Sequence, residues 1–198
     1  MILQALASYY EALLRQKKVA APGWGPVKVS FALCIREDGT LERVLPLQTE
    51  QQRGNKTVLA PQILSLPAPV KRTVGVAANF LCDNSGYLLG VDQKGKPQRT
   101  AECFAACKAL HEELFSDVDT PAARAVLAFF RTWQPEQARE HPALAERWEE
   151  ILSGGNLVFR YEDRYVLEDP EIRRAWERHY SGTPVEDSPP MVCLVTGE

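Results

Sequence analysis

A stretch near the middle of the chain, VKRTVGVAANFLCDN (residues 70–84), holds residue types that suit the binding of a polyanion. Lys71 and Arg72 are adjacent cations that can neutralise phosphates, and an arginine can bind one phosphate through two hydrogen bonds. Gly75 allows a partner to approach the backbone closely. The stretch keeps neither a helical nor a strand period, so we expect an ordered loop that presents these groups.

Two asparagines in the same stretch add groups that can tell one base pair from another. Asn79 and Asn84 each carry a hydrogen-bond donor and an acceptor. Phosphate contacts position a protein on a duplex, whereas small polar side chains read base edges. The minor groove is open to asparagine, to lysine and to backbone near a glycine. These residue types favour duplex binding; on charge alone, a solvated surface is the alternative.

The charge distribution separates this middle region from the rest of the chain. The whole chain has a net charge of −3, yet residues 53–99 hold seven cations against two anions, which gives +5. The cations are Arg53, Lys56, Lys71, Arg72, Lys94, Lys96 and Arg99. A cationic region in an acidic chain indicates a polyanionic partner.

Other patterns that could support chemistry are weaker. GVDQKGKP (90–97) nearly spells a phosphate-binding loop, but a proline replaces the hydroxyl that would hold Mg²⁺, and no helix is expected directly after it. Cys103, Cys107 and His111 share a helical face, and Cys82 is the one plausible fourth ligand of a zinc site. Buried cysteines are commonly core residues, and we expect that here. No histidine lies in a motif of nucleophilic catalysis, so we expect no catalytic residue, no metal and no cofactor.

The elements that position these residues change in character along the chain. The first half predicts a helix at 2–17, a hairpin of strands 27–35 and 41–47, a polar loop at 48–56, an edge or irregular segment at 60–70 and a short strand at 87–91. The second half predicts helices at 100–114, 121–133 and 144–152, a small hairpin at 156–168 and a helix that begins at Asp169-Pro170.

These elements predict an α+β fold, in which a β-hairpin-rich N-terminal half packs with a helical C-terminal half. The chain, 1–198, divides into a β-rich cationic part (1–99), a helical part (100–180) and a tail (181–198) with an apolar, strand-like run at 191–195. The five cysteines form no CxxC pairs, and neither a secretory leader nor an apolar run long enough for a bilayer is evident. We expect a reduced, cytoplasmic protein without a membrane partner.

Several quoted segments, taken in order, resemble the N-terminal region of one protein family. They are MILQALASYYEAL, KVSFALCIREDGTL, VKRTVGVAANFLCDNSGYLLG, CFAACKALH, NLVFR, PEIRRAW and CLVTGE. The chain is similar to the large subunit of the type I-C CRISPR Cascade surveillance complex, from residue 1 to the end. The most specific part is KRTxGxxxNFLCDNxxYxLG. Because members of that family are longer, the resemblance implies an N-terminal fragment.

The resemblance implies a non-catalytic, DNA-binding subunit of an RNA-guided antiviral complex. Such a subunit inspects duplex DNA for the protospacer-adjacent motif, helps to unwind the target and later helps to recruit a helicase-nuclease. Its implied partners are duplex DNA, the guide RNA through the complex, and the crRNA-capping and backbone subunits. A viral anti-CRISPR inhibitor is a further candidate partner. The alternative is a protein-interaction module, whose acidic helical half contacts other subunits or the nuclease without reading DNA.

The candidate DNA-binding residues divide by chemistry. Lys71 and Arg72 are expected to hold phosphates, with Gly75 permitting close approach, and Thr73, Asn79 and Asn84 are expected to face base edges. Phe80, Leu81 and Tyr87 are expected to anchor the loop to the core. The remaining candidates are the cations Lys56, Lys94, Lys96 and Arg99.

Overall fold

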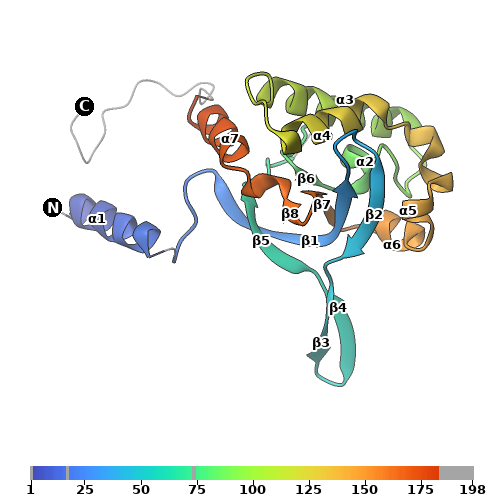
Figure 1. Cartoon of the computed structure of the whole chain (residues 1–198). Helices are drawn as coiled ribbons and strands as arrows, with labels where there is room; N and C mark the ends of the chain where they lie inside the picture. Colours follow the sequence, from blue (N-terminus) through green and yellow to red (C-terminus); the bar gives the residue numbers. More distant parts are fainter. Residues whose placement is uncertain (1, 17, 73–74, 183–198) are drawn as a thin grey trace.

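A computed structural model describes residues 2–16, 18–72 and 75–182, and it confirms the predicted α+β fold (Figure 1). Strands dominate the first half and helices the second. The helices are α1 (Ile2–Arg15), α2 (Ser85–Leu88), α3 (Pro97–Leu114), α4 (Pro121–Thr132), α5 (Pro142–Ala145), α6 (Trp148–Leu152) and α7 (Pro170–Gly182), with 3₁₀ turns at Pro135–Glu140 and Val166–Glu168. The strands are β1 (Trp24–Ile35), β2 (Leu41–Pro46), β3 (Thr49–Arg53), β4 (Lys56–Ala60), β5 (Gln62–Pro67), β6 (Cys82–Asp83), β7 (Asn156–Tyr161) and β8 (Arg164–Tyr165).

Strand β1 organises the main sheet, whose order is β2-β1-β7-β6. Its second half pairs antiparallel with β2 and parallel with β7, and its first half pairs antiparallel with β5. The predicted hairpin 156–168 is confirmed, since β8 folds back on β7. Because β7 comes from the helical half and lies between β1 and β6, the two halves of the chain share one sheet.

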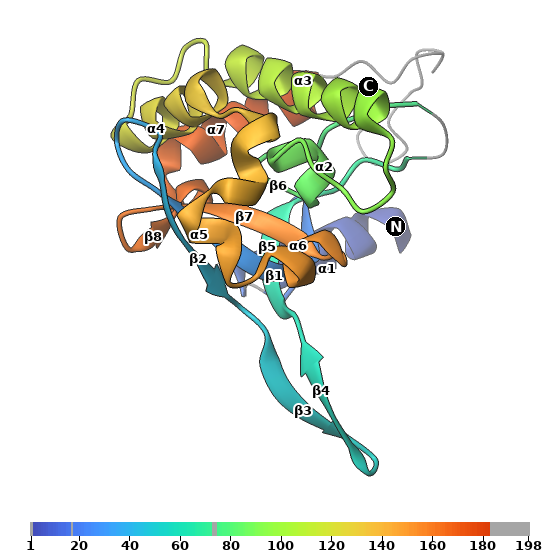
Figure 2. The ribbon, with the colours of Figure 1, turned by 90° about the vertical axis from the view of Figure 1, so that its right-hand side faces the viewer.

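The edge of β1 that carries β2 also carries β5, and a hairpin projects from the junction between them. Phe31 lies opposite Pro46, and Val29 lies opposite Gln62. Strands β3 and β4 extend from this point away from the body (Figures 1 and 2). The prediction of a polar loop at 48–56 is therefore wrong. Both faces of this ribbon lie in solvent, so its sequence lacks the alternation of a half-buried strand.

Helices α3, α4 and α7 cover one face of the sheet (Figures 1 and 2). Their apolar sides meet the sheet through aromatic rings: Phe129 and Phe130 of α4 lie 5.2 and 5.7 Å from Phe159 of β7, measured between ring centroids. The start of α4 is as predicted, because the Thr120 hydroxyl accepts a hydrogen bond from the amide of Ala123 at 3.3 Å. These contacts place one hydrophobic core between sheet and helices.

Two other sequence-based expectations differ from the structure. The short strand expected at 87–91 is instead the end of α2 and the turn after it, and the strand lies earlier, at β6. The run Tyr87, Leu88, Leu89 is buried on every side, so its pattern does not distinguish strand from helix. The helix expected at 144–152 is broken into α5 and α6. The run at 191–195 lies outside the described residues.

Helix α1 stands apart from the other helices (Figure 1). None of its described residues is buried, although its sequence is amphipathic as predicted. Within the described part of the chain, no helix has the length and apolar character needed to cross a membrane.

Candidate nucleic-acid interface

The predicted loop lies beside the start of α3, and a hydrogen bond joins them. Nη2 of Arg99 donates to the carbonyl oxygen of Gly75 at 2.9 Å, although the two residues are 24 apart in sequence. Figure 2 shows the loop passing the N-terminal end of α3. We call residues 68–72, 75–84 and 92–99 together the loop–α3 surface. Two cationic segments that the sequence keeps apart therefore form one surface.

Four cations on this surface are exposed: Lys71, Lys94, Lys96 and Arg99. The amide of Lys94 donates to the Asp92 carboxylate at 3.0 Å, which fixes the turn before α3. A hollow of about 540 Å³ opens beside Lys96 and Arg99 at the first turn of α3. Asp92 is the one anion within these residues that is not buried, against four exposed cations, and Glu102 also lines the hollow. The loop–α3 surface thus carries a net positive charge.

Arg72 is held by the loop itself. Its guanidinium binds both oxygens of Asp83, with Nη1 at 3.0 Å from Oδ1 and Nη2 on Oδ2, and Nε donates to the Ala77 carbonyl oxygen at 2.6 Å. It also lies over the Tyr87 ring, 4.0 Å from the centroid. Burial lowers the pKa of Arg72, but hydrogen bonds and the charge of Asp83 raise it by more. In this conformation Arg72 shapes the loop, and a phosphate would have to compete with Asp83 for it.

The two asparagines also take part in the loop's internal bonding. Oδ1 of Asn79 accepts from the amide of Val70 at 2.9 Å, and Oδ1 of Asn84 accepts from the amide of Gly86 at 3.0 Å, where it caps α2. Among the residues that the structure describes, none accepts a hydrogen bond from Nδ2 of Asn79. Within the described ranges, which leave out residues 73 and 74, this donor therefore has no partner.

Asp83 is the residue around which the loop is organised, and no role for it was predicted from the sequence. It is fully buried, and besides Arg72 it accepts hydrogen bonds from the amides of Asn79 and Asn84 at 2.9 and 2.8 Å. A buried carboxylate is stable only when it is paired and hydrogen-bonded. One signal was available: Asp83 is an anion within an apolar stretch of a cationic region.

The predicted anchors are confirmed, and a buried histidine joins them. Phe80, Leu81 and Tyr87 are each at most 5% exposed. Leu81 has a positive φ of 59°, and its amide donates to Nε2 of His111 at 3.0 Å. Nδ1 of His111 lies 2.7 Å from the carbonyl oxygen of Cys107, so it carries the proton in the neutral ring. Burial lowers the pKa of His111 to about 4.

The other predicted site residues are placed differently. Gly75 adopts φ +91°, a conformation that favours glycine, and no atom of a described residue beyond its chain neighbours lies within 4 Å of the position its Cβ would take. Thr73 lies outside the described residues. Lys56 lies on the β3–β4 hairpin, opposite Arg53 next to the turn, and not on the loop–α3 surface.

The possible zinc site and the possible phosphate-binding loop, for which the sequence gave only weak signals, both differ from functional sites of those kinds. Cys103, Cys107 and His111 are buried, as expected for core residues, and both ring nitrogens of His111 are engaged. In the described ranges no cluster of histidine, cysteine or carboxylate side chains is arranged to hold a metal ion. A helix does follow GVDQKGKP directly, contrary to expectation, because α3 begins at Pro97. The segment before the motif is α2 rather than the strand that a phosphate-binding loop follows.

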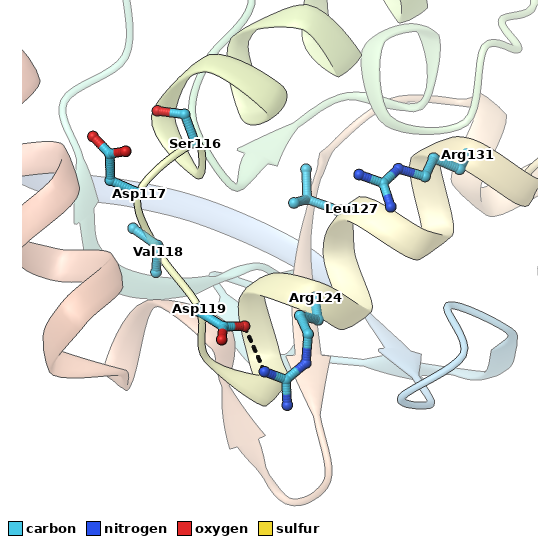
Figure 3. A pocket seen from close by; sticks show the side chains of 7 residues that line it. All are labelled: Ser116, Asp117, Val118, Asp119, Arg124, Leu127 and Arg131. Atoms are coloured by element: carbon cyan, nitrogen blue, oxygen red, sulfur yellow. Dashed lines mark hydrogen bonds and ion pairs between the residues drawn. The ribbon is translucent and has the colours of Figure 1, made fainter.

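Another hollow, of about 500 Å³, lies at the opposite end of α3, at the turn into α4 (Figure 3). Its charges are mixed. Arg124 pairs with Asp119 at 2.6 Å, while Arg131 and Asp117 lie on either side. A surface with paired opposite charges attracts a polyanion less than the loop–α3 surface does.

The fold is a mixed sheet with helices α3, α4 and α7 on one face, and its cationic loop is held by the pair of Arg72 and Asp83. The chain belongs to the family described as CRISPR-associated protein (Cas_Csd1), whose model matches residues 6–198. No curated protein matches the chain. The family assignment agrees with the resemblance in the sequence at the level of a CRISPR-associated protein.

Proposed function

We propose that the chain is the N-terminal part of the large subunit of a type I-C Cascade complex, and that it binds duplex DNA at the protospacer-adjacent motif without catalysing a reaction. The observation that carries this proposal is the loop–α3 surface. Lys71 comes from the loop, and Lys96 and Arg99 come from the start of α3; the bond between Arg99 and Gly75 joins these two segments, and all three cations are exposed. The family of CRISPR-associated proteins supplies the biological setting.

The proposed chemistry divides between charge and shape. Lys71, Lys94, Lys96 and Arg99 neutralise phosphates of the duplex, and each neutralised phosphate releases counterions. The pair of Arg72 and Asp83 keeps the loop in one conformation before DNA arrives, so less ordering entropy is lost on binding. In such complexes guide pairing reads the long sequence, and protein reads a short motif before the strands exchange.

Asn79 is the residue proposed to read a base. Its Oδ1 supports the loop, and its Nδ2, for which no described residue is an acceptor, is the group proposed to contact the base. The minor groove offers purine N3 and pyrimidine O2 as acceptors, and a G·C pair differs by the added amino donor of guanine. A mismatched base pair in a recognised site costs about 1–3 kcal/mol, so a small number of such contacts is enough for a short motif.

The test uses the complex reconstituted with the full-length protein and its guide RNA, on duplexes with and without the motif. Lys71→Ala and Lys96→Ala should each reduce the slope of log affinity against log salt by about 0.9, because each removes one phosphate contact. Arg131→Ala is the matched control, since Arg131 is exposed on α4 in a region of mixed charge. Unchanged slopes for both lysine variants would refute the assignment of this surface to DNA.

A second variant separates the proposed base contact of Asn79 from its hydrogen bond within the loop. Asn79→Asp keeps an oxygen that can accept from the Val70 amide but replaces the Nδ2 donor. We expect it to reduce the preference for motif-bearing over motif-free DNA at a given salt concentration. An equal loss of affinity for both duplexes would show that the new charge, and not a lost base contact, accounts for the effect.

A protein-interaction module is the second candidate function. It is favoured by one observation: helix α1 exposes an apolar stripe that the described part of the chain leaves uncovered. In that case the subunit contacts neighbouring proteins or the recruited helicase-nuclease, and the cations stay solvated. Lysine variants that leave DNA binding by the complex unchanged would support it.

A further inference from the structure

Helix α1 exposes the face that an amphipathic helix normally buries. Leu3, Leu6 and Tyr10 share one side of the helix and are 45%, 57% and 40% exposed. A 14-residue helix is marginally stable alone in water, and most helical stability comes from packing of the apolar face. We therefore expect a partner to cover the stripe of Leu3, Leu6 and Tyr10.

The stripe continues into a hollow at the C-terminal end of α1. This hollow has a volume of about 740 Å³ and lies between the end of α1, the start of β1, β5 and α7. Leu14 of α1 and Ile63 of β5 line it, and Ile63 is 64% exposed. The apolar surface thus extends from one helix onto the sheet.

The residues that line the hollow carry positive charge. Lys18 and Arg173 line it, and no aspartate or glutamate is among its lining residues in the described part of the chain. The guanidinium of Arg173 lies 4.1 Å above the centre of the Trp24 ring. Nε1 of Trp24 is buried, and no described residue accepts a hydrogen bond from it. The hollow therefore offers two cations, and an unmet donor lies beside it.

We propose that the α1 stripe and this hollow form a docking surface for a segment of another protein subunit, one with an apolar face flanked by aspartate or glutamate. The apolar face covers Leu3, Leu6 and Tyr10, and the acidic residues pair with Lys18 and Arg173. This inference rests on the proposed function, which places the chain in a multi-subunit complex.

The same observations disfavour two other classes of partner. A nucleic acid supplies phosphates but has little aliphatic surface to cover leucines. A membrane-surface helix carries several cations on its polar face, whereas the polar face of α1 has Glu11 and Arg15, which balance each other. A protein segment supplies both apolar surface and carboxylates.

The test is assembly of the complex from the full-length protein, its co-encoded subunits and guide RNA. Leu6→Asp and Lys18→Glu should each lower the association constant of this subunit at least about tenfold, as expected at a central contact. Ser8→Asp, on the polar face of α1, is the matched control and should leave assembly unchanged. Because Leu6, Ser8 and Lys18 are all exposed, the three substitutions should leave thermal unfolding of the chain unaltered.

A photo-crosslinking residue at Leu6 identifies the occupant. The expected product joins Leu6 to another protein subunit of the complex, within a peptide that contains aspartate or glutamate, and reversing that charge should restore assembly of the Lys18→Glu variant. Crosslinks to RNA or DNA would overturn the inference. So would binding to phosphatidylglycerol vesicles that Leu6→Asp abolishes, with no crosslink to protein. A complex that assembles equally well with both variants refutes this surface alone, whereas an unaltered chain that joins no complex refutes the proposed function itself.

Discussion

The ion pair between Arg72 and Asp83 predicts a large loss of stability when its carboxylate is removed. Asp83 is fully buried and accepts two hydrogen bonds from Arg72 and one each from the amides of Asn79 and Asn84. Asp83→Asn keeps the shape of the side chain but removes its charge. The amide NH₂ of the new residue would also face groups that already donate hydrogen bonds.

The expected magnitude follows from the burial of the two partners. Removing one partner of a buried ion pair costs about 3–5 kcal/mol, because the other charge is left without compensation. Here the side chain of Arg72 remains 25% exposed, so water can solvate part of the guanidinium. We therefore expect Asp83→Asn to lower the free energy of unfolding by about 2–3 kcal/mol.

Urea unfolding of a double-mutant cycle measures the pairwise part of this energy. We expect a coupling of about 1–3 kcal/mol between Asp83→Asn and Arg72→Met. The pair of Arg36 and Glu42 is the control, because it is also 3.0 Å long but has side chains that are 62% and 42% exposed. Its coupling should be at most about 1 kcal/mol. If the two cycles give equal coupling energies, Asp83 does not organise the loop in the way argued above.

Two further predictions concern His111 and Gly39. Burial lowers the pKa of His111 to about 4, below the unfolded value near 6.5, so its contribution is complete above pH 6.5 and is lost as the pH falls towards 4. Compared with His111→Gln, the unaltered chain should lose about 3 kcal/mol more of unfolding free energy across that window. Urea unfolding at several pH values measures this, and an equal pH dependence of the unfolding free energy in both proteins would contradict it. Gly39→Ala should destabilise the chain by more than about 3 kcal/mol, because Gly39 has φ +84° and its Cβ would lie 2.2 Å from the amide nitrogen of Phe129. Gly54→Ala, at φ +63° in open space, should cost about 1 kcal/mol, and equal shifts in melting temperature for the two variants would refute the steric argument.

Local patterns in the sequence were sufficient to predict most helices and the two hairpins that pack on the core. The stripe of Val126, Phe129 and Phe130 repeats at the helical period because one side of α4 faces the sheet. The β3–β4 hairpin was missed because most of its described residues are exposed on both faces, so no alternation marks its strands. Tyr87 and its neighbours were misassigned because a fully buried segment has no polar side from which a period can be read.

Part of the candidate site was predictable, and part depends on contacts between distant residues. The loop, its anchors and its exposed lysines follow from residue types near one another. The bonds from Arg72 to Asp83 and from Leu81 to His111 join residues 11 and 30 apart in sequence, and no regular spacing predicts them. The side chains with the richest hydrogen-bonding chemistry, Arg72 and Asn84, turned out to build the loop, while plainer lysines remain exposed.

The position of the β3–β4 hairpin determines where the sequence can vary in evolution without disturbing the main sheet. The amide of Leu47 donates to the carbonyl oxygen of Ser30 at 2.8 Å, and Gln62 lies opposite Val29, the residue before Ser30. The chain thus departs from the edge of the sheet and returns to the adjacent rung, so residues 48–61 are an insertion within what is otherwise one continuous strand. Lengthening, shortening or rewriting this ribbon leaves every rung of the sheet in place, and natural variants can explore new contacts here at little cost to folding.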